Sequence, residues 1–245
     1  MIILKKEFNS MQINFIFCLL TTLFTQSSLL AQSTIPEGYQ LVYFQDFESP
    51  QSIRDFEMTD EKAWKISKGK TGNSLELFGK SHYKARVRSP YNIAVLKNLI
   101  VGDFVLEADL SQTGKEYGHR DLCLFFGFTN STNFYYVHIA SKADNNANNI
   151  FLVNDEPRTN IAIKTTTGTN WGETNSIHKV RIERDLKKGS IKVFFDDFST
   201  PIMEANDTHF MEGKIGFGSF DDTGKFDNIK IWSPNISEDQ KGLFR

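Results

Sequence analysis

The chain has 245 residues, a net charge of −2 and 22 phenylalanines, and aromatic residues make up 13% of it. A charge this close to zero argues against a nucleic-acid polymer as partner, because phosphate binding requires a clustered excess of Lys and Arg. The length suits one β domain, and the phenylalanine content suits the half-buried surface of a sheet.

Residues 1–31 have the features of a signal peptide. Lys5 and Lys6 provide a positive start, residues 15–24 form an apolar run, and residues 29–31 resemble a cleavage site. The apolar run is too short to span a bilayer, although an uncleaved N-terminal anchor is the alternative. We therefore expect export, either secreted or periplasmic, with no stable membrane insertion after cleavage.

Residues 32–233 are predicted to form a single domain, followed by a flexible C-terminal tail at residues 234–245. The first half of this domain alternates apolar and polar residues, the pattern of half-buried strands. Strands are predicted at residues 41–48, 74–78, 82–90 and 104–110. Residues 91–99 fit either a helical turn or a strand.

Residues 117–158 are predicted to form three strands and two turns. In residues 121–128 the even-numbered positions are apolar, and in residues 134–140 the odd-numbered positions are. A hairpin between these strands places His138 near Leu124 and Cys123, with the register open by a residue or two. The remaining positions carry aromatic rings and ionisable groups. We therefore expect each strand to have one apolar face toward the core and one mixed face, on which rings and ionisable groups lie together.

The second half of the chain continues the alternation. Strands are predicted at residues 161–165, 176–185, 190–197, 201–205, 213–220 and 225–232. No amphipathic helix is found, and turn residues separate the strands. The pattern predicts an all-β fold, an antiparallel jelly-roll β-sandwich in a single domain, whose first and last strands pair.

Several strand motifs occur in a characteristic order, beginning with GDFVLEADL at residues 102–110. FYYVHIA at residues 134–140 and GKIGFGSFDDTGKFDNIKIW at residues 213–232 follow. This order resembles the concanavalin A-like lectin/glucanase superfamily, and is similar to secreted laminin-G-like and keto-disaccharide-hydrolase-like bacterial sandwiches. The superfamily holds lectins, hydrolases and lyases alike, so the resemblance over residues 41–232 implies a polysaccharide or oligosaccharide partner without separating binding from catalysis.

Glu107 and Asp109 lie two residues apart on one predicted strand, so their side chains share a face, roughly 7 Å apart. Retaining glucanases of the superfamily use a Glu-x-Asp-x-(x)-Glu strand motif, but Ser111 and Gln112 stand where the second Glu belongs. A retaining mechanism needs two carboxyl groups flanking the glycosidic bond. We therefore interpret the pair as polar residues of a sheet face, available for substrate contacts.

Asp121, Tyr136 and His138 are the candidate catalytic residues. The resemblance implies that in sandwich-fold lyases of uronic acids a Tyr/His pair removes the C5 proton while Arg or Asn neutralises the carboxylate. A hydrolase would use Asp121 as base and His138 as its partner. A sheet histidine bonded to an aspartate without any catalysis is equally common, so binding, catalysis and a structural role stay open.

The candidate substrate-binding residues are Tyr117, His119, Asn154, Arg158 and Trp171, with Glu107 and Asp109. Aromatic rings among them suit the C–H faces of sugars. Trp171 is either an exposed stacking platform or a core residue at a sandwich edge. Cys123, the only cysteine beyond residue 31, is interpreted as a packed thiol rather than a nucleophile because it lies mid-strand.

Asp46, Glu48 and Asp227 meet if the terminal strands pair, and sandwiches of this superfamily often hold a structural ion there. Ca²⁺ is therefore the one cofactor expected. The oxygen-rich loop at residues 144–149 is either a second calcium loop or an ordinary turn. The five histidines have no zinc-ligand spacing and there is no cysteine cluster, so no zinc site is predicted.

Overall fold

The computed structural model describes residues 34–239 and 242–244, all of which belong to one structural unit, Ala31–Arg245. The predicted signal peptide lies outside the described residues. Within them, no helix has the length and apolarity needed to cross a membrane.

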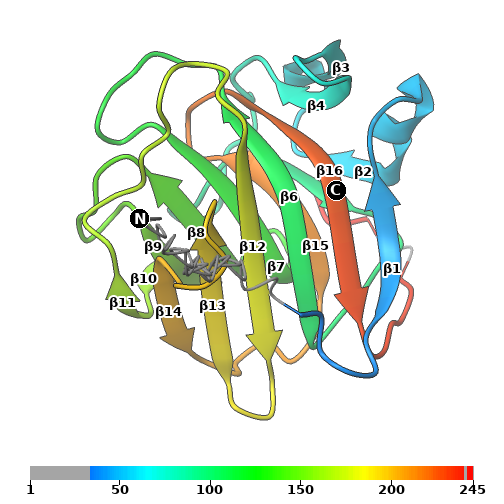
Figure 1. Ribbon diagram of the computed structural model, residues 1–245, viewed down its shortest axis with the longest axis vertical. Coiled ribbons are helices and arrows are strands. Elements are labelled where there is room, and N and C mark those ends of the chain that lie inside the picture. Colours follow the sequence, from blue (N-terminus) through cyan, green and yellow to red (C-terminus); the bar gives the residue numbers. More distant parts are fainter. Residues whose placement is uncertain (1–33, 240–241, 245) are drawn as a thin grey trace, which may run out of the picture. The chain divides into compact units, whose positions relative to one another are not determined.

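Two antiparallel sheets form a sandwich (Figure 1). Sheet A consists of β1 (Gln40–Gln45), β3 (Trp64–Lys68), β4 (Asn73–Leu77), β6 (Phe104–Gln112), β11 (Ala162–Thr165), β12 (His178–Asp185), β13 (Ser190–Phe195), β14 (Met203–Asn206) and β16 (Gly224–Ser233). Its order is β11-β14-β13-β12-β6-β16-β4-β3, with β1 also paired to β16. The pairing of β1 with β16 confirms that the first and last strands meet.

Sheet B consists of β2 (Phe56–Met58), β5 (Asn92–Leu96), β7 (Asp121–Asn130), β8 (Asn133–Ala140), β9 (Asn149–Asn154), β10 (Thr159–Asn160) and β15 (Lys214–Ser219). Its order is β10-β9-β8-β7-β15-β5-β2. Two short 3₁₀ helices, η1 (Pro50–Asp55) and η2 (Glu61–Ala63), are the helical elements of the described residues. The predicted all-β antiparallel sandwich is therefore confirmed.

The core between the sheets is built from alternate side chains of each strand. Leu106 and Leu110 of β6 belong to one buried cluster with Leu122 and Leu124 of β7 and with Val137 of β8. Each such side chain contributes about 1.5–3 kcal/mol relative to an exposed position. The alternation seen in the sequence thus identifies this face of both sheets correctly.

The outer face of sheet B differs from the mixed face expected from the sequence, because it is packed as a second apolar cluster. Its buried members are Ile93, Val95, Cys123, Phe125, Phe128, Phe134, Tyr136, Phe151 and Val153. Strand pairing places Phe125, Tyr136 and Phe151 side by side on β7, β8 and β9. Their rings stack at centroid distances of 5.9 and 5.0 Å. Both faces of the central strands of sheet B are therefore buried.

A local irregularity in β7 moves Phe128 from the expected face to this second cluster. Gly127 has a positive φ of 56°, and the pairing of β7 with β8 shifts register between Phe126 and Asn130. Such a bulge turns the following side chain to the other side of the sheet. Phe126 accordingly lies in the central core and Phe128 in the outer cluster.

Residues 80–91 form no strand, so the strand predicted at residues 82–90 is wrong. Burial does alternate there, since Tyr83 and Val87 are half-buried while Lys84 and Arg86 are exposed. Val87 packs against the outer cluster of sheet B. The period-two pattern therefore arises from a loop that lies along a sheet face without backbone pairing.

Part of the predicted C-terminal tail also contacts this face. The Glu57 carboxylate accepts hydrogen bonds from the backbone N–H of Leu243 (3.0 Å) and Phe244 (3.3 Å). The Phe244 ring packs edge-on against Phe128 (5.7 Å) and Tyr83 (5.9 Å). These contacts add to the cover of the outer cluster, and the flexibility of the tail stays a prediction.

Candidate functional site

The three catalytic candidates lie together on the outer face of sheet B. Asp121 and Cys123 are two residues apart on β7, and His138 is directly opposite Cys123 on β8. His138 Nε2 lies 3.3 Å from Asp121 Oδ2, an ion-pair distance, although the angles fall outside hydrogen-bond geometry. Of the two expected neighbours, Leu124 and Cys123, the strand pairing selects Cys123, so His138 shares a face with Asp121.

Asp121 is fully buried and receives donors from two strands. Its Oδ2 accepts hydrogen bonds from Phe220 N–H (2.9 Å), Ser219 Oγ (3.1 Å) and Cys123 Sγ (3.1 Å). Burial alone would raise the pKa of Asp121, but the His138 imidazole and these donors outweigh burial and hold the pKa below its usual range. Asp121 is therefore a buried carboxylate anion.

Tyr136 and Arg158 complete the cluster. Arg158 Nη1 donates to the Tyr136 hydroxyl (2.8 Å), and its guanidinium lies over the rings of Phe151 (4.9 Å) and Phe220 (4.6 Å). Burial raises the pKa of Tyr136 well above its ordinary value, which outweighs the opposite effect of Arg158. A neutral phenol does not suit the phenolate base of the lyase hypothesis. His138 is only 4% exposed, so substrate does not reach the cluster in this arrangement.

A second buried carboxyl connects this cluster to the neighbouring loop. Asp222 Oδ2 accepts hydrogen bonds from the Tyr117 hydroxyl (2.7 Å) and from Asp121 N–H (2.9 Å). Burial raises the pKa of Asp222 to about 7, and the negative charge of Asp121 adds to the effect. Asp222 therefore changes charge near neutral pH while Asp121 stays ionised.

We expect Asp222 to make stability depend on pH. The folded state favours the protonated acid, so its stabilising contribution is greatest below the unfolded-state pKa of about 4 and is lost as the pH rises to about 7. Asp222→Asn keeps an oxygen acceptor for Tyr117 and removes the titration. Thermal unfolding from pH 4 to 8 should give a flatter profile for the variant than for the wild type, and equal slopes would contradict the assignment.

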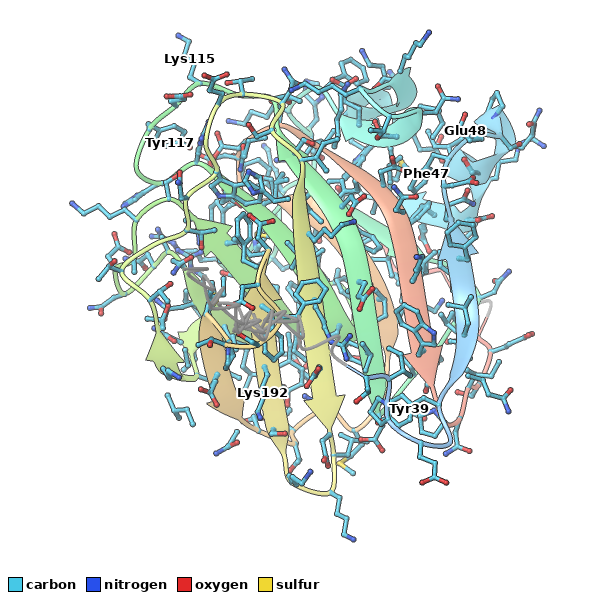
Figure 2. All side chains as sticks on the ribbon, in the orientation of Figure 1. Tyr39, Phe47, Glu48, Lys115, Tyr117 and Lys192 are labelled. Carbon is cyan, nitrogen blue, oxygen red and sulfur yellow. The ribbon has the colours of Figure 1, made fainter. Side chains whose placement is uncertain are left out.

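A polar cleft of about 580 Å³ lies among the loops beyond the ends of the strands. Its lining comes from Glu116, Tyr117, Gly118 and Arg120 between β6 and β7, from Ser141 after β8, and from residues 167–172 between β11 and β12. Tyr117, at the upper end of the view in Figure 2, is 46% exposed there. The cleft therefore presents one accessible aromatic ring among polar loop groups.

Arg120 and Trp171 line the same cleft from buried positions. Arg120 Nη2 donates to the Gly172 carbonyl (2.6 Å), whereas its Nη1 has no hydrogen-bond partner among the described residues. Trp171 is 1% exposed, and its ring packs edge-on against His178 (5.6 Å) and Phe195 (5.1 Å). The exposed-platform interpretation of Trp171 is therefore wrong, because β12 and β13 supply rings that bury it.

The two-sheet architecture is shared by solved structures of other proteins. The carbohydrate-binding module CBM66 from Bacillus subtilis has a TM-score of 0.51 at 18% identity, covering 73% of this chain and 96% of the module. A Bacillus subtilis protein of unknown function with a galectin-like fold has a TM-score of 0.54 at 14% identity, covering 82% of this chain and 100% of that protein. The chain has a concanavalin A-like fold.

A third structure, a candidate glycosyl hydrolase from Parabacteroides distasonis, has a TM-score of 0.51 at 13% identity and covers 78% of this chain and 99% of that one. No protein-family model matches the sequence, and neither does any curated protein. At such low identity the similarity establishes the concanavalin A-like fold alone.

Glu107 and Asp109 lie on β6, on the outer face of sheet A and thus on the opposite side of the sandwich from Asp121. Glu107 Oε1 pairs with Arg181 Nη1 (2.7 Å), and Asp109 Oδ1 pairs with Lys179 Nζ (2.9 Å). β12 lies beside β6 and places these cations directly opposite the two carboxylates. The structure therefore does not bring Glu107 and Asp109 together with the cluster on sheet B.

Two further candidates also lie apart from the cluster. His119 Nε2 lies 2.8 Å from Asp144 Oδ2, and both side chains are exposed on loops. Asn154 ends β9 opposite Asn133, five residues and roughly 16 Å along the strand from the position opposite His138. Only Arg158, among the predicted substrate-binding residues, contacts a catalytic candidate directly.

The predicted calcium ligands come near each other without converging. Burial and, to a smaller extent, the carboxylates of Asp109, Glu48 and Asp46 together raise the pKa of Asp227 to about 6. Glu48 Oε1 is engaged by the N–H of Asn73 (2.9 Å). Within the described part of the chain these carboxylates do not form a group with ligand atoms inside 4.8 Å of one another. Structural Ca²⁺ at this edge of the concanavalin A-like sandwich stays a prediction.

The end of β15 and the turn that follows it supply functional groups that the sequence pattern does not reveal. Ser219, Phe220 and Asp222 all contact or surround Asp121, although Asp221-Asp222-Thr223-Gly224 has only the sequence pattern of a hairpin turn. Their proximity depends on β15 lying beside β7, a pairing of strands about ninety residues apart that no local pattern indicates.

Proposed function

We propose that the protein is an exported carbohydrate-binding sandwich that takes a polysaccharide or oligosaccharide in the cleft at the strand ends. The observation that carries the proposal is the cleft itself, which combines the accessible ring of Tyr117 with polar loop groups. Sugars are bound by stacking of C–H faces on aromatic rings and by hydrogen bonds to hydroxyl groups. The concanavalin A-like fold, shared with a carbohydrate-binding module, supports this function.

Arg120 provides a specific argument for a hydroxyl-bearing ligand. Its guanidinium is held by the Gly172 carbonyl while Nη1 keeps an unused donor. Buried donors without partners cost free energy, and a ligand oxygen would satisfy this one once the cleft wall shifts to expose Nη1, which is itself buried. Thr167, Thr169 and Asn170 add hydroxyl and amide groups along the same wall. The lining thus has the mixed donor and acceptor character that a polyhydroxylated ligand needs.

Removal of the Tyr117 ring tests this site. We expect the wild-type protein to be retarded by a polysaccharide in affinity gel electrophoresis against a panel of neutral and uronic-acid polymers. Tyr117→Ala should weaken that affinity about ten-fold, equivalent to about 1.4 kcal/mol, because the stacking surface is lost.

Tyr117→Phe is the matched control, since it keeps the ring but loses the hydrogen bond to Asp222. Its affinity should stay within about two-fold of the wild type, a free-energy change below about 0.5 kcal/mol. Ile163→Ala, at an exposed position elsewhere, should change nothing. Absence of retardation on every polysaccharide, or unchanged affinity of Tyr117→Ala, would refute the cleft as a glycan site.

A second candidate function is a glycoside hydrolase or polysaccharide lyase, favoured by the clustering of Asp121, Tyr136, His138 and Arg158 in one place. It requires the Arg158 guanidinium and the Phe220 ring to move, because they pack over the cluster. New reducing ends would indicate hydrolysis, and ultraviolet absorption of unsaturated uronates would indicate elimination. Full activity of His138→Ala would exclude this cluster as the catalytic site.

Export belongs to the same proposal and rests on residues 1–31. Fractionation of the producing cells followed by N-terminal sequencing checks it. A mature N-terminus close to Gln32 in the periplasm or the medium is the expected result, and an intact N-terminus in the cytoplasmic fraction would contradict it.

A further inference from the structure

Three side chains of different metal-binding chemistry meet on the outer face of sheet B. Asp121, Cys123 and His138 each offer one ligand atom, and these atoms all lie within 4.8 Å of one another. Asp121 and Cys123 share a face because they are two residues apart on β7, and strand pairing puts His138 opposite Cys123. The arrangement is therefore fixed by backbone pairing at the centre of the sheet rather than by a surface loop.

The spacing of the ligand atoms fits a tetrahedral ion. Asp121 Oδ2 lies 3.3 Å from His138 Nε2 and 3.1 Å from Cys123 Sγ. In a zinc site with bonds of about 2.0–2.3 Å, neighbouring ligand atoms are about 3.3–3.7 Å apart. The third separation, between the Cys123 and His138 ligand atoms, is within 4.8 Å, so side-chain movements of about 1 Å would bring the three atoms to those distances.

Unused lone pairs inside the cluster provide an independent observation that points to a ligand. Among the described residues, Asp121 Oδ1 and both ring nitrogens of His138 are buried without a hydrogen-bond partner. The two residues are 0% and 4% exposed. Such orphaned buried groups are uncommon in folded proteins, and a bound metal ion would use the lone pair of one His138 ring nitrogen together with a carboxylate oxygen of Asp121.

We propose that Asp121, Cys123 and His138 bind Zn²⁺. A thiolate, an imidazole and a carboxylate together form a donor set that suits zinc, whereas calcium and magnesium prefer oxygen ligands alone. A water molecule completes four-coordination, since Asp221 lies near Asp121 but does not form one group with Cys123 and His138. Sequence spacing does not show this site because its ligands come from two paired strands.

Binding of the ion replaces the Cys123 S–H bond by a sulfur–zinc bond, and the thiol proton leaves to solvent. Without the ion, Cys123 Sγ donates its proton in a hydrogen bond to Asp121 Oδ2 (3.1 Å), and this is the proton that leaves. The site is formally neutral when loaded, because one thiolate and one carboxylate balance the two positive charges. That neutrality reduces the cost of burying the ion in an apolar cluster.

Cobalt(II) reports on such a site directly, because a bound thiolate gives a charge-transfer band and tetrahedral geometry gives intense visible bands. The full-length protein is freed of metal with a chelator and titrated with Co²⁺ and then with Zn²⁺, both when folded and during refolding. We expect one Co²⁺ per chain with the thiolate band, displaced by Zn²⁺. Zn²⁺ should also raise the thermal midpoint.

Cys123→Ser and His138→Gln should each weaken Zn²⁺ binding at least about ten-fold and abolish the Zn²⁺-dependent rise in the midpoint. Cys18→Ser and His119→Ala are the matched controls and should change neither. A wild-type protein without the thiolate band under both loading conditions overturns the proposal, even if no variant folds. Retention of the band in Cys123→Ser, or its loss in Cys18→Ser or His119→Ala, also overturns it. Glycan binding at the Tyr117 cleft is measured separately and does not depend on this result.

Discussion

Asp121→Ala is expected to lower the free energy of unfolding by about 3–5 kcal/mol, because it removes one partner of a buried ionic cluster. The carboxylate accepts donors from Phe220 N–H, Ser219 Oγ and Cys123 Sγ, and alanine leaves all of them unpaired in a buried place. His138 also loses the carboxylate that lies 3.3 Å from its Nε2. Urea unfolding monitored by tryptophan fluorescence measures the loss.

Glu204→Ala is a suitable control, since it breaks the Lys164–Glu204 ion pair (2.8 Å) at the surface. Exposed pairs of this kind contribute about 0–1 kcal/mol. An Asp121→Ala variant as stable as Glu204→Ala would mean that the buried hydrogen bonds do not hold β15 against β7.

Gly218→Ala is expected to destabilise the protein by about 3 kcal/mol through overlap in the middle of sheet B. A Cβ at this position would overlap the Asn92 carbonyl oxygen of β5 and lie 3.2 Å from the Phe125 ring. Asn92 cannot retreat easily, because its side chain accepts from Ser81 N–H (2.8 Å) and donates to the Phe220 carbonyl (3.2 Å). A fall in the thermal midpoint of about 6–12 °C is the expected readout.

Gly79→Ala provides the comparison for this effect. Its added Cβ would meet only Ala63 Cα at 3.7 Å, an ordinary van der Waals distance. The midpoint should therefore stay within about 2 °C of the wild type, because substitutions free of such strain change stability by about 0.5 kcal/mol or less. Equal thermal midpoints for Gly218→Ala and Gly79→Ala would show that β5 can move to accommodate the added Cβ without loss of stability.

Alternation along single strands is enough to predict the core between the sheets. It assigns Leu122, Leu124 and Val137 to the inner face, and the structure places them there. Alternation is not enough for the outer face of sheet B, because rings such as Phe125 and Phe134 occupy the positions that look solvent-facing in the sequence. Whether such rings are covered depends on distant segments, here residues 80–91 and the chain end, and a local pattern carries no information about them.

The part of the candidate site that lies on the β7–β8 hairpin can be predicted from the sequence. The sequence brings Asp121 and His138 together in outline, since the turn between β7 and β8 limits the register to a residue or two. It does not predict Asp222 as a partner of Asp121, because that contact depends on sheet order. The exposed interpretation of Trp171 is wrong for a similar reason, since the environment of this ring comes from β12 and β13.

The bulge at Gly127 has a consequence for how the molecule unfolds. One strand inserts Phe126 into the layer between the sheets and Phe128 into the layer outside them, with Gly127 between. If the packing of either layer is lost, the backbone segment at Gly127 is no longer held in place. The ring that this segment contributes to the other layer then loses its packing as well. We therefore expect the two apolar layers to form a single cooperative unit that melts in one transition, in which inner and outer rings lose their packing together.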